Sequence, residues 1–174
     1  MTRWQHNDGG RSTAGFKGSA GDCVTRAIAI ASGLPYRKVY DDLTSHGRVF
    51  MESSSTKVAR RMRARGRATP RDGVYKEVYK PYIEDALGWT WTPTMKIGQG
   101  CTVHLRGDEL PAGRLIVKCS KHLVAVVDGI IQDTSDTSRD GTRCVYGYWT
   151  PPPNQSPPRP AVLHPPVRRG PTLA

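Results

Sequence analysis

Cys23 stands at the start of a short apolar segment that has the features of a helix carrying a nucleophile. The segment reads DCVTRAIAIASG from Asp22 to Gly33. Asp is a favoured N-cap residue and Gly a favoured residue just after a helix, so the pattern predicts a helix with the thiol in its first turn. Free N–H groups and the positive end of the helix dipole stabilise a thiolate at that position, and the thiolate is the nucleophilic form of cysteine.

A histidine and an aspartate that could serve this cysteine lie far along the chain. His122 begins the apolar run HLVAVV, the dipeptide Asp128-Gly129 follows, and the next run, IIQD, ends at Asp133. Asp-Gly between two β-branched runs is a strong signal for a hairpin with a two-residue turn. A cysteine at a helix start with a distant His and Asp is the layout of a nucleophile, its base and the group that orients the base.

The spacing also predicts which side chains share a face of this hairpin. The expected register pairs the following residues: Val127 with Ile130, Val124 with Asp133, and His122 with Ser135. Because side chains alternate between faces, His122 and Asp133 share one face as diagonal neighbours, roughly 7–8 Å apart at the backbone. Asp136 falls on the opposite face and Asp128 lies in the turn, so we expect Asp133 to orient His122.

The order of these residues resembles the papain-like cysteine peptidases, most closely the compact bacterial and phage-encoded C39-like and NlpC/P60-like groups. The resemblance covers roughly residues 19 to 150 and rests on the segments Gly-Asp-Cys at 21–23 and His-Leu-Val-Ala-Val-Val-Asp-Gly at 122–129. It implies that Cys23 is the nucleophile, His122 the general base and Asp133 the orienting residue. It also implies an α+β fold in which N-terminal helices, the nucleophile helix first, pack on a C-terminal antiparallel β-sheet.

One feature of that family is missing from the expected place. Its members usually carry a Gln or Asn a few residues before the cysteine as an oxyanion donor, and residues 15 to 22 contain neither. The remaining candidates are Asn7 and Gln5, reaching back from the lead-in, and the backbone N–H of Cys23.

Other interpretations of the same residues stay open. A cysteine in an apolar helix can be an ordinary buried hydrophobe, and His122 can be a surface residue at a strand start. The pairs Cys101-x-x-His104 and Cys119-x-x-His122 have a short spacing that zinc sites use. Both pairs lie in strand-like segments, where residues three apart point to opposite faces, so the sequence favours no metal site and no cofactor.

A basic stretch follows the first helices and suggests an anionic partner. The chain carries a net charge of +11, and six arginines crowd this stretch: Arg60, Arg61, Arg63, Arg65, Arg67 and Arg71. Guanidinium groups bind phosphates and carboxylates, so nucleic acid and an acidic protein are both candidate partners. The plainer alternative is a solvated helix end that keeps the protein in solution.

The rest of the chain divides into a Gly-rich lead-in at 1–21, one α+β domain at 22–150 and a Pro-rich, extended tail at 151–174. Besides the nucleophile helix, helices are expected at 36–43, 52–65 and 74–87, the last kinked or split by Pro81, and strands at 88–92, 102–105, 114–118 and 144–149. No run approaches the ~20 apolar residues of a membrane span and no signal peptide is visible, so we expect a cytoplasmic protein with no membrane partner. In that compartment the four cysteines are expected to be reduced.

Two functions are therefore in view. The first is a cysteine peptidase-like hydrolase or thiol acyltransferase acting on a peptide, isopeptide or amide bond, with Cys23, His122 and Asp133 as its triad. The second is a catalytically inactive papain-like scaffold, a basic binding or structural protein of a phage or mobile element that contacts nucleic acid or a virion protein. The intact triad favours the first function, and the absent Gln favours the second. The oligomeric state does not follow from the sequence.

Overall fold

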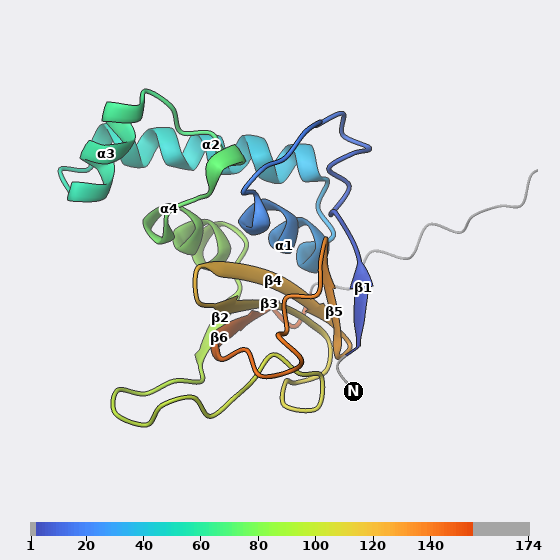
Figure 1. The fold of residues 1–174 in the computed structure, drawn as a ribbon. Coiled ribbons are helices and arrows are strands. Elements are labelled where there is room, and N and C mark those ends of the chain that lie inside the picture. The colour runs from blue at the N-terminus through green and yellow to red at the C-terminus, as the bar shows by residue number, and fades with distance from the viewer. Residues whose placement is uncertain (1–2, 155–174) are drawn as a thin grey trace, which may run out of the picture.

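The chain folds as α+β, with N-terminal helices packed on one face of a six-stranded, mostly antiparallel sheet (Figure 1). The structure is a computed structural model, and it describes residues 3–154. Its helices are α1 (Cys23–Ser32), α2 (Tyr36–Ser53), α3 (Lys57–Arg65) and α4 (Lys76–Pro81), with a 3₁₀ turn at Pro70–Asp72 and a π-helical turn at Tyr82–Ala86. Its strands are β1 (Trp4–His6), β2 (Thr90–Pro93), β3 (Arg114–Cys119), β4 (His122–Val127), β5 (Ile130–Asp133) and β6 (Val145–Thr150).

The strands lie in the order β1-β5-β4-β3-β6-β2, and β1 with β5 is the one parallel pair among the described strands. The turn at Asp128-Gly129 joins β4 to β5 in the expected register, with Val127 opposite Ile130. This ladder runs as far as Ala125 opposite Gln132 and ends there. The two further pairs expected at Val124 and His122 are not formed, so the strand ends that carry His122 and Asp133 lie beyond the paired part of the hairpin.

Helix α1 is buried on nearly every side because it lies between the sheet and α2 (Figure 1). Its small and branched residues join a core that includes Ile116 and Ala125 of the sheet and Val39 of α2. Gly33 ends the helix in the left-handed conformation, with φ of 74°, as the sequence predicts. The helix is therefore held rigidly against β4, which fixes the position of its first residue.

The other face of the sheet is covered by the long connection between β2 and β3. Leu105 and Leu110 of this connection pack on a second buried cluster with Val117, Val124 and Ile131. A disulfide joins Cys101 in the connection to Cys144 just before β6. The expectation that all four cysteines are reduced is thus wrong for this pair, because the fold brings two residues together that are far apart in sequence.

The predicted helix boundaries need correction between residues 36 and 65. The helix expected to end at 43 continues to Ser53, and its second half packs on a distant segment. Gly47 allows the close contact, since a Cβ there would lie 3.1 Å from the Ala68 carbonyl oxygen. The next helix begins at Lys57, where the Thr56 hydroxyl accepts a hydrogen bond from the Ala59 N–H. Of the helix expected at 52–65, residues 54–56 form the break between α2 and α3, and residues 57–65 are helical as predicted.

Other expectations are met in part. The segment expected to be helical from 74 to 87 is split at Pro81, where α4 gives way to the π-helical turn. The strand expected at 102–105 is reduced to a single bridge between His104 and Cys144. The lead-in contains a strand that the sequence did not predict, since β1 pairs along β5.

The Pro-rich tail expected at 151–174 lies outside the described residues from 155 onward. Within residues 3–154, no helix combines the length and apolar character needed to cross a lipid bilayer.

Candidate active site

The fold brings Cys23, His122 and Asp133 together, as the sequence predicts. Cys23 is the first residue of α1 and is half-buried, while His122 is the first residue of β4. The His122 Nε2 atom lies 2.7 Å from Oδ2 of Asp133, and the ring lies beside the Cys23 thiol at one cavity, close enough to lower the pKa of the thiol. Since Nε2 is used by Asp133, Nδ1 is the ring nitrogen left for Cys23. The three side chains form a continuous chain of contacts from carboxylate to sulfur.

This contact chain favours an ionised cysteine. Burial raises the pKa of the Cys23 thiol, but the hydrogen bond and charge of His122, the Leu123 N–H and the charge of Arg26 outweigh it, so the pKa lies below its ordinary value of 9.0. Burial lowers the pKa of His122, but its bonds to Asp133 and Cys23 and their negative charges raise it to about 9. The two shifts have opposite signs, so thiolate and imidazolium coexist over a range of pH.

Asp133 stays a carboxylate for related reasons. It is 4% exposed, and burial alone raises its pKa. The bond to His122, the N–H of Thr134 and the charges of His122 and Arg26 more than offset burial and hold the pKa of Asp133 below its ordinary value. Asp133 is therefore negatively charged near neutral pH and keeps the protonated imidazole in one orientation.

Arg26 and Asp22 stand behind this carboxylate, and the sequence did not single out either for that role. The Arg26 Nη2 atom lies 3.3 Å from Oδ1 of Asp133, and its Nη1 atom pairs with Asp22. Asp22 is 1% exposed and also contacts Arg11 and the hydroxyl of Tyr36. Asp22 occupies the predicted N-cap position of α1, but its side chain makes no capping bond because it binds these inward partners instead. Arg26 is the one basic residue in an otherwise apolar helix, and this was the sequence signal that could have indicated its role.

An open cavity of about 430 Å³ lies against the sulfur. The segment from Asp72 to Lys76 lines it, together with Tyr79, Lys118 and Lys121. Lys118 Nζ donates to the Tyr79 hydroxyl at 2.9 Å, which leaves the phenolic proton free to donate to another group. Burial, and then negative charge on Cys23 and Glu77, raise the pKa of Tyr79 to about 12, so the hydroxyl stays protonated.

The two amides proposed as oxyanion donors lie elsewhere. Asn7 Nδ2 donates to Gln132 at 2.8 Å, and Gln5 Oε1 accepts from the same Gln132 at 3.2 Å. Neither residue lines the cavity at Cys23. The third candidate, the backbone N–H of Cys23, lies in the first turn of α1, where an N–H has no partner within the helix.

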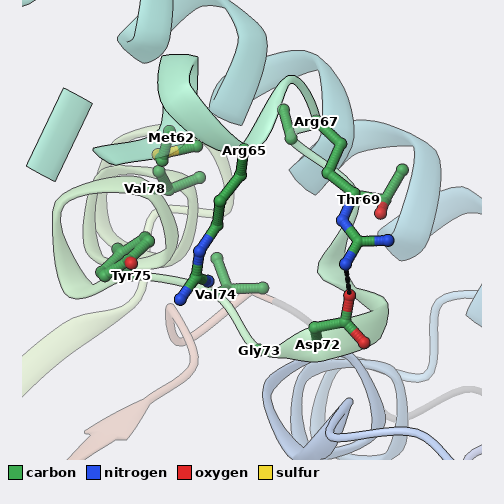
Figure 2. Close-up of a pocket in the computed structure, with 10 residues that line it drawn as sticks. Met62, Arg65, Arg67, Thr69, Asp72, Gly73, Val74, Tyr75 and Val78 are labelled. Atoms are coloured by element: carbon green, nitrogen blue, oxygen red, sulfur yellow. Dashed lines mark ion pairs between the residues drawn. The ribbon is translucent and has the colours of Figure 1, made fainter. Parts of the chain in front are cut away.

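The arginines of the basic stretch play different parts. Arg63 donates to the carbonyl groups of Met51 and Ser54, so it ties α3 to the end of α2. Arg60 and Arg61 are exposed on α3. Arg65 and Arg67 line a hollow beside the Asp72–Tyr75 segment, and Arg67 pairs with Asp72 (Figure 2). Arg71 donates to the Ser19 carbonyl at 3.3 Å.

The two Cys-x-x-His pairs do not come together as a metal site. Cys101 is in the disulfide, His104 contacts Glu109, and His122 contacts Asp133 and Cys23. Residues 3–154 contain no group of three or more His, Cys, Asp or Glu side chains placed to hold a metal ion.

What these residues can do is nucleophilic chemistry at an electrophilic carbon. One open cavity is lined by the groups that such chemistry needs. The thiolate can attack, the protonated imidazole can transfer a proton, and the free N–H and O–H groups can stabilise an oxyanion. Comparison of the chain with models of protein families, with curated proteins and with solved structures found no match.

Proposed function

We propose that this protein is a thiol-dependent hydrolase or acyltransferase acting on a peptide, isopeptide or amide bond. The observation that carries the proposal is the contact chain from Asp133 through His122 to Cys23, with Cys23 at the start of α1 beside an open cavity. The order helix-borne Cys, strand-borne His and Asp on the following strand supports a papain-like type of site. The established α+β arrangement is compatible with that type.

In the first half of the reaction the Cys23 thiolate attacks the carbonyl carbon, and a carbon–sulfur bond forms as the carbonyl π electrons move to oxygen. When the tetrahedral intermediate collapses, the carbon–nitrogen bond breaks and His122 gives its Nδ1 proton to the leaving nitrogen. A thioester on Cys23 and a neutral His122 remain. Asp133 stays ionised throughout and holds the imidazole in place.

In the second half, neutral His122 takes a proton from the incoming nucleophile, which attacks the thioester. Water gives hydrolysis, and an amine gives acyl transfer with the same proton movements. Collapse of the second intermediate releases the Cys23 thiolate and restores the imidazolium. The same residues therefore support both outcomes, and the nucleophile admitted by the cavity decides between them.

In this proposal, two groups stabilise the oxyanion. The Cys23 backbone N–H is one, and the Tyr79 hydroxyl, held from behind by Lys118, is the other. Losing one such donor typically costs about 3–4 kcal/mol of transition-state stabilisation. Tyr79 thus takes the part that Gln5 and Asn7 were expected to play.

The proposal is tested by trapping the acyl-enzyme. The protein is incubated with p-nitrophenyl acetate, and peptide mass spectrometry is used to locate the acetyl group. We expect rapid acetylation of Cys23 and turnover of the ester, both lost in Cys23→Ala and strongly slowed in His122→Ala. In parallel, a randomised peptide pool is incubated with the wild-type protein and with Cys23→Ala to detect amide cleavage or transfer. Acetylation of Cys23 no faster than that of a small thiol in solution, together with an unchanged pool, would rule the proposal out.

The second candidate is an inactive scaffold that binds an anionic partner, such as nucleic acid or an acidic virion protein. The exposed arginines Arg60 and Arg61 and the net charge of +11 favour it. It predicts an unreactive Cys23 and partner binding that weakens with salt.

A further inference from the structure

The walls of the cavity at Cys23 carry a surplus of positive charge. Three lysines line it, Lys76, Lys118 and Lys121, and Asp72 is the one carboxylate among the lining residues. Lys76 and Lys121 are exposed, and neither forms an ion pair with a described residue. Lys118 is held by the Tyr79 hydroxyl, which is neutral. A molecule entering the cavity meets cationic groups on several sides.

The positive charge continues past the cavity along a shared wall. The segment from Asp72 to Tyr75 lines the cavity at Cys23 and also the hollows next to α3. Figure 2 shows Arg65 reaching from the end of α3 toward Val74 and Tyr75, with Arg67 paired to Asp72 on the other side. Arg65 forms no ion pair with a described residue, so its guanidinium is free for a ligand.

The shared wall offers backbone hydrogen-bond donors as well as positive charge. The N–H groups of Val74 and Tyr75 donate no hydrogen bond to any described residue, and both residues are half-buried in an extended stretch before α4. Free N–H groups next to apolar side chains suit an extended polypeptide, which brings its own carbonyl groups. Single-stranded nucleic acid would stack several bases on exposed aromatic faces, but Tyr75 and Tyr79 are the aromatic residues that line the two hollows, and they are half-buried and 4% exposed.

We propose that the cavity and the adjoining hollow form one groove for an acidic peptide segment, in which carboxylates near the attacked bond pair with Lys76, Lys121 and Arg65. This inference rests on the proposed function and names its substrate class. The occupant carries Asp or Glu side chains within a few residues of the bond that Cys23 attacks. Because the groove has five cationic side chains and one carboxylate, neutral and basic segments bind less well there.

The first test measures binding separately from chemistry. The full chain with Cys23→Ala is immobilised and given two synthetic decapeptide pools, identical except that Asp and Glu in one are replaced by Asn and Gln in the other. We expect at least about fivefold stronger retention of the acidic pool at low salt, falling as salt is raised, since each exposed pair is worth only a few-fold. Equal retention of the two pools would overturn the inference.

Matched charge variants test whether the preference for the acidic pool depends on the groove. Arg65→Gln with Lys121→Gln, both at exposed positions without ion pairs, should reduce the preference for the acidic pool about fivefold or more. Arg60→Gln with Arg61→Gln removes the same charge from the same region but outside the groove, and should leave the preference nearly unchanged. Equal loss in both pairs would mean that net charge, and not the groove, selects the peptide, which contradicts the proposal.

Cleavage and competition separate this inference from the proposed function. If the wild-type protein cleaves a mixed pool next to acidic residues, the result supports the proposed function and the acidic-peptide groove. Cleavage without that preference supports the function but contradicts the groove. If Cys23 is unreactive but the Cys23→Ala protein still retains the acidic pool through Arg65 and Lys121, the groove stands and the function falls. A single-stranded oligonucleotide of equal charge that binds more tightly and displaces the acidic pool would assign the surface to nucleic acid and overturn the peptide.

Discussion

The two free thiols of this chain, Cys23 and Cys119, show how strongly surroundings set chemical behaviour. Cys119 is buried in the sheet, and burial raises the pKa of its thiol to about 11. Cys23 is also largely shielded from water, yet His122 and the Leu123 N–H bring its pKa below the ordinary value. The same residue type is therefore harder to ionise at one place and easier to ionise at the other because of its neighbours, not its burial.

We predict that iodoacetamide labels Cys23 well below pH 9.0 and does not label Cys119 in the folded protein. The thiolate of Cys23 persists as the pH falls until it reaches the lowered pKa, whereas Cys119 stays protonated. In His122→Ala the thiolate loses its partner, so labelling at neutral pH should fall about tenfold for each unit by which the pKa rises. Peptide mass spectrometry across pH measures both sites in one sample. Parallel labelling curves for the two thiols would contradict the prediction.

Turnover should have a limit at high pH as well. His122 must hold a proton to release the leaving nitrogen, and its pKa is about 9, so the rate should decline as the pH rises through about 9. It should also decline as the pH falls through the lowered pKa of Cys23, which gives a bell-shaped profile. A profile of kcat/KM against pH tests this, and a rate that keeps rising beyond pH 9 would show that the protonated imidazole is not required.

Arg26 is expected to act as a positioning residue, because it bridges Asp22 and Asp133 and touches no part of the open cavity. Replacing Arg26 with Gln leaves two buried carboxylates with one cationic partner fewer, which typically costs about 3–5 kcal/mol of folding free energy. The loss of its charge also raises the pKa of Cys23. The low-pH side of the curve of Cys23 labelling against pH, its acidic limb, should therefore move to higher pH. Arg26→Lys keeps the charge and should restore that limb in part. Denaturant unfolding and the labelling profile measure the two effects; a merely structural role would leave the limb where it is.

Local signals made α1 and the β4–β5 hairpin predictable from sequence, and these elements carry Cys23, His122 and Asp133. The Gly33 stop, the Asp128-Gly129 turn and the apolar runs each act over a few residues. The full length of α2, strand β1 and the Cys101–Cys144 disulfide depend on contacts between distant segments, which a local pattern does not contain. Tyr79 and Arg26 were missed for the same reason, since the cavity position of Tyr79 depends on where α4 lies and the bridge made by Arg26 depends on where Asp133 of β5 lies.

The disulfide is expected to stabilise the face of the sheet opposite the helices. It closes a loop with a sequence separation of 43, and a loop of that size corresponds to about 4 kcal/mol in the chain-entropy model. Cys101→Ser with Cys144→Ser should therefore lower the free energy of unfolding by about 2–4 kcal/mol, while labelling of Cys23 stays unchanged because it lies on the helix side. Denaturant melts and intact mass without reductant test this. Four free thiols in the native protein would show that the bond does not form.

The site as a whole depends on segments from widely separated parts of the chain. The lead-in adds β1 to the sheet edge, then crosses α1, where Gly9 lies against Arg26 and Arg11 reaches Asp22. Phe16 packs on Tyr36 and Tyr40 and so fastens the lead-in to α2. The lead-in is thus a structural part of the domain, and it covers the buried charges behind Asp133.

Two neighbouring glycines allow that packing to be tested. Gly9 and Gly10 both have positive φ, 67° and 85°, so alanine at either position should cost about 1–2 kcal/mol in backbone strain. A Cβ at Gly9 would also lie 3.2 Å from the Arg26 carbonyl oxygen, whereas a Cβ at Gly10 has no atom within 4 Å. Gly9→Ala should therefore be the less stable variant by about 1 kcal/mol or more, because the lead-in must move off α1.

The Gly9 and Gly10 variants also test whether the lead-in affects the reactivity of Cys23. Displacing the lead-in in Gly9→Ala loosens the Arg26 bridge, so labelling of Cys23 at neutral pH should slow in this variant and stay near wild type in Gly10→Ala. Thermal melts and Cys23 labelling of both variants give the two comparisons, and Gly10→Ala controls for backbone strain alone. If the two variants lose equal stability and label equally, the contact between Gly9 and Arg26 contributes nothing. The lead-in would then support the buried charges through the Arg11–Asp22 pair and not through Gly9.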